Sequence, residues 1–171
     1  MVNKLRLTWW PFIGVALAIV GPCWSQQVRV PTDVELHATY CLVVVQLQRQ
    51  DLAPTIQDTE RLLLAAPQTT RHNVADTLEN LRSLDRMFQS NMSRLQAYLV
   101  PRTSQLEPNA LLAAHARGRA DLERLNASDI LTTCFKKCNA SVTSTCAAAC
   151  MAEDPLYRRV ATCGNLDFLP F

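Results

Sequence analysis

The sequence predicts an all-α protein, a disulfide-stapled helical bundle with a C-terminal helical hairpin, preceded by a signal peptide. Three observations lead to this prediction. Four cysteines form two CxxxC pairs between Cys134 and Cys150. An apolar stripe with steps of three and four residues runs from Val74 to Leu99, as in a long amphipathic helix. Residues 1–25 have the three parts of a secretory signal, and disulfides persist in the compartments that such a signal leads to.

The spacing of the paired cysteines predicts which of them bond. Cβ atoms four residues apart on a helix lie about 5–6 Å from each other, whereas a disulfide needs about 3.5–4.5 Å. Each pair must therefore bond to a neighbouring helix. The link 139–145 is rich in turn-forming residues and short enough to make the two helices antiparallel. We therefore expect the outer cysteines, Cys134 and Cys150, to bond, and likewise the inner ones, Cys138 and Cys146.

A metal site is the alternative for the same cysteines. Four thiolates can hold zinc, and soft thiolates also select copper(I). The two CxxxC pairs resemble the disulfide-bonded helical hairpins of small mitochondrial import chaperones, although those have a longer insert. They also resemble bacterial helical-bundle copper-storage proteins, which carry many more such pairs. The resemblance covers Cys134 to Cys150 only, so a copper or zinc site on Cys134, Cys138, Cys146 and Cys150 stays open.

The first 25 residues predict the compartment. Lys4 and Arg6 precede an almost wholly apolar stretch, 9–20, and small residues occupy positions −3 and −1 of a cut after Ser25. We expect cleavage there, and so a periplasmic or secreted protein. The alternative is an uncleaved membrane anchor over residues 7–24, which is just long enough to span a bilayer.

Removal of the signal would leave an even number of cysteines. Cys23 would be lost with residues 1–25, and six cysteines would remain. The hairpin accounts for four of them, so the remaining pair, Cys41 and Cys163, should form a third disulfide. That bridge would close a loop of about 120 residues and could contribute about 4–5 kcal/mol to stability in the chain-entropy model.

Composition limits the function of the remaining chain, residues 26–171, which is long enough for one helical domain. The whole sequence has 17 basic and 15 acidic residues. Two of the basic residues, Lys4 and Arg6, belong to the signal, which leaves fifteen of each sign. A near-neutral chain does not predict a binder of nucleic acid or of anionic membranes.

Caps, breaks and periodicity predict the individual helices. Thr32 and Glu35 form a capping box, and the nearly all-apolar segment 36–47 predicts a central, buried helix. Residues 51–54 read as a break. Gly118 is a candidate for a close helix crossing. The predicted helices cover about 32–49, 54–66, 71–99 and 109–125, followed by the disulfide hairpin region 126–163 and an apolar tail that docks on the bundle.

The histidines do not predict a catalytic or metal site. His37 and Cys41 lie on one helix face, and we expect a packed histidine beside a disulfide. His115 lies on an apolar stripe and is expected at an interior or boundary position. None of the three histidines is clustered with carboxylates at ligand spacing, and no nucleophile motif is present. We therefore predict no catalytic residue, no cofactor and no enzyme activity.

The sequence favours three functions in order. The first is an exported, non-enzymatic binding or accessory module that meets a protein partner, with the hairpin as a rigid presenting element. The second is the cysteine-based copper or zinc protein. The third is a carrier of an apolar ligand, which would require an internal cavity and rests on architecture alone.

Overall fold

The computed structural model describes residues 28–138 and 145–170, and within them it confirms the all-α, disulfide-stapled fold. The predicted signal segment and most of the hairpin link lie outside the described residues. No helix in the described ranges is long and apolar enough to cross a membrane. The helices are α1 (Asp33–Ala65), α2 (Gln68–Thr103), α3 (Pro108–Asn126), α4 (Ile130–Cys138), α5 (Thr145–Glu153), α6 (Pro155–Ala161) and the 3₁₀ turn η1 (Thr162–Gly164).

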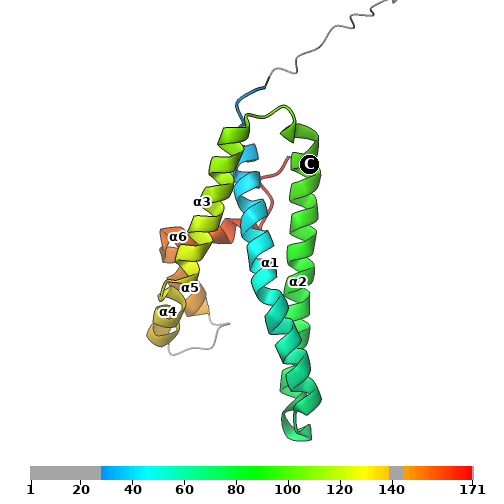
Figure 1. The fold of residues 1–171 in the computed structure, drawn as a ribbon. Coiled ribbons are helices and arrows are strands. Elements are labelled where there is room, and N and C mark those ends of the chain that lie inside the picture. Colours follow the sequence, from blue (N-terminus) through cyan, green and yellow to red (C-terminus); the bar gives the residue numbers. More distant parts are fainter. Residues whose placement is uncertain (1–27, 139–144, 171) are drawn as a thin grey trace, which may run out of the picture.

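Helix α1 is the centre of the molecule, as its apolar segment predicts. It contacts both α2 and α3, and Figure 1 shows α2 following it to its far end while α3 lies beside its first part. Its residues Ala38, Cys41, Val44 and Val45 are at most 1 % exposed, since a helix that is apolar nearly all round must be covered on several sides. α2 contributes Leu95 to the same core. The bundle is therefore built around the first half of α1.

Gly118 confirms the predicted close crossing, which lies between α3 and α1. A Cβ atom on this glycine would lie 2.5 Å from Val43 Cγ1 and 2.7 Å from the Tyr40 carbonyl oxygen. The second of these neighbours is main chain and cannot turn away. Any larger residue would therefore force the two helices apart.

The predicted break at residues 51–54 is wrong, because α1 continues through Pro54. Proline removes one helical hydrogen bond and crowds the preceding turn, at a cost of about 3 kcal/mol. The chain is buried on both sides of this point, at Leu52 and at Thr59, and α1 is in contact with α2, in which Leu78 is 3 % exposed. Burial against α2 offsets the cost of the proline, which itself points to solvent.

Helix α2 is longer than the predicted 71–99. It begins at Gln68 and passes through Pro101 to end at Thr103. Two side chains donate to carbonyls of its last turns: Thr103 Oγ1 donates to the Leu99 carbonyl at 2.8 Å, and the Arg102 guanidinium donates to the Tyr98 carbonyl.

The lead-in to α1 is fastened to the turn between α2 and α3. The Arg29 amide donates to Gln105 O at 2.8 Å, and its carbonyl accepts from Glu107 N at 3.0 Å. The Arg29 guanidinium binds both carboxylate oxygens of Glu35. Glu35 also accepts from the Thr32 amide at 2.8 Å, which confirms the capping box.

The apolar tail docks on the bundle, as predicted. Asp154 caps α6 by accepting from two backbone amides at 2.8 Å. After η1, Leu166 and Leu169 are buried to 2 % and 6 % exposure, and Phe168 packs beside them. The end of the chain therefore belongs to the main core.

Candidate functional site

The hairpin α4–α5 is closed by two disulfides. Cys134 is bonded to Cys150 and Cys138 to Cys146, with Cα–Cα distances of 5.6 Å and 5.8 Å. These are the pairs that the antiparallel geometry predicts. Ala147 of α5, next to Cys146, is completely buried. Cysteines bonded in this way are not thiolates, and in the described ranges no group of three or more His, Cys, Asp or Glu residues could hold a metal ion.

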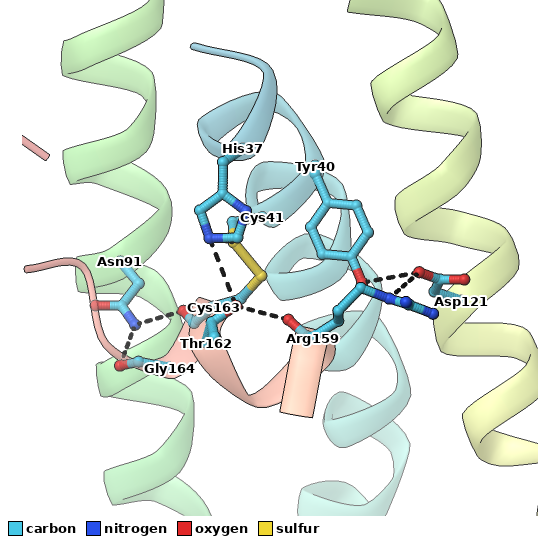
Figure 2. Close-up of a disulfide and its surroundings, with 9 residues drawn as sticks. All are labelled: His37, Tyr40, Cys41, Asn91, Asp121, Arg159, Thr162, Cys163 and Gly164. Atoms are coloured by element: carbon cyan, nitrogen blue, oxygen red, sulfur yellow. Dashed lines mark hydrogen bonds and ion pairs between the residues drawn. A yellow bond between two sulfur atoms is a disulfide. The ribbon is translucent and has the colours of Figure 1, made fainter. Parts of the chain in front are cut away.

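A third disulfide, Cys41–Cys163, joins α1 to η1 across 122 residues, again as the cysteine count predicts. Both cysteines are at most 1 % exposed. Figure 2 shows that Asn91 of α2 holds the same segment: its side-chain amide donates to Cys163 O at 3.5 Å and to Gly164 O at 3.3 Å. The bridge therefore lies where α1, α2 and the C-terminal segment meet.

His37 packs beside this disulfide, which confirms the expectation from its spacing. Its Nε2 lies 3.7 Å from Cys41 Sγ and 3.5 Å from Thr162 Oγ1, and its ring meets Phe168 edge-on at 4.5 Å between centroids. Burial lowers the pKa of His37, because desolvation disfavours the charged imidazolium. The imidazole is thus packed between the Cys41–Cys163 disulfide and the ring of Phe168.

A buried carboxylate joins three elements beside His37. Asp121 of α3 is 3 % exposed; its Oδ2 accepts from the Tyr40 hydroxyl at 3.3 Å and from Arg159 Nε at 3.2 Å (Figure 2). Burial, followed by the charge of Asp121, raises the pKa of Tyr40 to about 12. The sequence does not single out Asp121, because its burial depends on α6, whose approach leaves no local signal.

Next to this network a groove opens between α1, α3 and α6, with a volume of about 420 Å³. We call it the α1–α3 groove. The two helices begin at the same end of the molecule (Figure 1), so the groove follows the first turns of both. It is lined by Asp33, Leu36, His37, Tyr40, Ala110, Ala113, Ala114, Arg117 and Arg159.

His115 is exposed, which corrects its expected interior or boundary position. It lines a smaller open groove of about 300 Å³ on the other side of α3, together with Leu42, Leu99 and Leu111. The apolar stripe of α3 faces α1 less directly at this turn than its sequence suggests, since Ala114 is the residue buried there.

Comparison with known proteins finds no relative of this chain. No family model, no curated protein and no solved structure matches the chain. The fold and the sites define it as an all-helical protein stapled by three disulfides.

Proposed function

We propose that the protein is an exported, non-enzymatic binding or accessory module that presents the hairpin α4–α5 to a protein partner. The observation that carries the proposal is the construction of the hairpin. Two disulfides fix its helices to each other, while it contacts the rest of the molecule chiefly through α6. In Figure 1 it lies to one side of the three long helices. A rigid element loses little conformational entropy on binding.

The chemistry of the hairpin surface favours a partner with an acidic rim around an apolar spot. Leu131 is 47 % exposed, and Lys136 and Lys137 are both exposed. They are the only lysines after the signal segment. Complementary charges of this kind steer encounter and fix orientation.

The three disulfides support the compartment, because such bonds persist in oxidising surroundings. They are compatible with the periplasm or the extracellular space, and export through residues 1–25 remains a prediction from the sequence. Copper or zinc handling and apolar-ligand carriage also remain predictions. The first would require reduction of both hairpin disulfides, and the second would have to use grooves that are open to solvent.

Site-specific crosslinking tests the proposal. A photo-crosslinking amino acid replaces Lys137 at the end of α4, and in a matched control it replaces Gln89, which is exposed on α2. In cells that make and export the protein, we expect a crosslinked protein partner from position 137 and none from position 89. Equal crosslinking at both positions, or none at either, contradicts the proposed role of the hairpin.

A further inference from the structure

The α1–α3 groove has the size and lining of a small-molecule site. Its volume of about 420 Å³ falls in the range of ligand pockets, which are mostly apolar with a few placed polar groups. The rings of His37 and Tyr40 form one wall, from α1. Ala110 and Ala113 form the other, from α3, and their short side chains leave the space open.

One end of the groove is cationic. Arg117 and Arg159 both line it, and both charges act to lower the pKa of Tyr40, which places them near the same hydroxyl. Arg159 uses Nε for Asp121, and its terminal nitrogens have no hydrogen bond within the described residues. Arg117 has no hydrogen bond or ion pair within that part of the chain. The single negative charge of Asp121 is shared between Arg159 and Arg124, so the charge of Arg117 is left for a ligand.

The opposite end of the groove is acidic. Asp33, in the first turn of α1, lines it, and its carboxylate would repel an anion placed there. The groove therefore has a direction: an anionic group belongs beside the two guanidinium groups, and an apolar group belongs between the aromatic rings and the alanines.

We propose that the α1–α3 groove binds a small molecule that carries an oxyanion, a carboxylate or a phosphate ester, on a compact apolar body. The planar guanidinium groups of Arg117 and Arg159 match the oxygens of either anion. The site lies outside the hairpin surface and goes beyond the function proposed above, so each proposal can fail without the other.

Titration of the protein, purified with its three disulfides intact, tests this site by amide NMR shifts. The probes are benzoate, phenyl phosphate, neutral benzamide and inorganic phosphate. We expect benzoate or phenyl phosphate to shift amides of residues 33–40 and 110–117, and the comparison of these two identifies the preferred anion. Benzamide and inorganic phosphate should each bind at least about tenfold more weakly, because each lacks one half of the recognised structure.

Two variants and a control make the test specific. Arg117→Gln removes the unpaired charge, and Ala113→Leu fills the groove at an exposed position; each should weaken the better probe about tenfold or more. Arg119→Gln, on an exposed part of α3 outside the groove, should bind like the parent protein. Dispersed spectra show that each variant is folded. The proposal is overturned if benzamide or inorganic phosphate binds as tightly as the better aromatic anion. It is also overturned if both variants bind that anion as tightly as the parent protein does.

Discussion

At the scale of the residue, single side chains decide how closely the elements approach. Gly118 lets α3 lie against the backbone of α1. Three residues later, Asp121 accepts hydrogen bonds from Tyr40 of α1 and Arg159 of α6. The hydrogen bond depends on the close crossing, because the Asp121 carboxylate reaches Tyr40 only when α3 and α1 are in contact. The polar network and the close crossing together fix the wall of the α1–α3 groove.

Substitution of this glycine should destabilise the protein. In Gly118→Ala the new methyl group meets main chain at 2.7 Å, so the helices must separate. We expect the free energy of unfolding, measured by chemical denaturation, to fall by about 1–3 kcal/mol, despite the higher helix propensity of alanine. Gly164→Ala is the control, because nothing lies within 4 Å of its added Cβ. A Gly118→Ala protein as stable as the parent would show that the crossing is not tight.

Glu35 should make stability depend on pH. The Arg29 guanidinium, bound to the carboxylate, lowers the pKa of Glu35 from 4.5 to about 2, against the opposing effect of burial. A lowered folded-state pKa means that the stabilisation is present above about pH 4.5 and is lost as the pH falls towards 2. Glu35→Gln should therefore lose less stability than the parent over this window, by up to about 3 kcal/mol.

The control for this measurement is a solvent-exposed ion pair. Glu79 is 63 % exposed and pairs with Arg86, and such pairs contribute little. Denaturation curves of Glu79→Gln should keep the pH dependence of the parent protein between pH 6 and pH 2. If Glu35→Gln behaved in the same way, the pair of Arg29 with the buried Glu35 carboxylate would not be a source of stability.

At the scale of the element, sequence patterns predict the helices well and their ends less well. The stripe of α2 and the cap of α1 are both present, because periodicity and capping are local properties. Pro54 is misread as a break, since the force that keeps α1 continuous comes from α2, more than twenty residues away in sequence. Tertiary burial overrides a local signal here.

Pro54→Ala should stabilise the protein. The residue is exposed inside α1, so alanine restores the missing backbone hydrogen bond without disturbing the core. We expect the free energy of unfolding to rise by about 1–3 kcal/mol. Pro67→Ala, at the N-cap of α2 where no helical bond is lost, should change stability by less than about 1 kcal/mol. A loss of stability in Pro54→Ala would mean that the bundle needs the proline.

At the scale of the whole molecule, the disulfides hold together segments that lie far apart in sequence. Cys41–Cys163 joins the first helix to the last turn across 122 residues, while Cys138–Cys146 spans only 8. Cysteine counting and helix spacing predict these pairs. A disulfide needs a partner within reach, and once four of the six cysteines are paired in the hairpin, the remaining two can bond only to each other. The α1–α3 groove could not be predicted, since its lining comes from three elements whose approach is set by packing.

The loss of stability on removing one disulfide should increase with the length of the loop that the disulfide closes. In the chain-entropy model, replacing both Cys41 and Cys163 by alanine costs about 5 kcal/mol, whereas replacing both Cys138 and Cys146 costs about 2.5 kcal/mol. Denaturation of the two double variants under non-reducing conditions checks this order. The reverse order would show that the hairpin disulfide, and not the Cys41–Cys163 disulfide between α1 and η1, contributes more to stability.

The central claim is that sulfurs a helical turn apart bond to a neighbouring helix and never to each other. Peptide mapping of the purified, unreduced protein tests it most directly, because each bridge links two peptides of known mass. The account predicts Cys134 with Cys150, Cys138 with Cys146, Cys41 with Cys163, and no free thiol among these six. A peptide in which Cys134 is bonded to any other residue, or in which the hairpin cysteines are unoxidised, would contradict it.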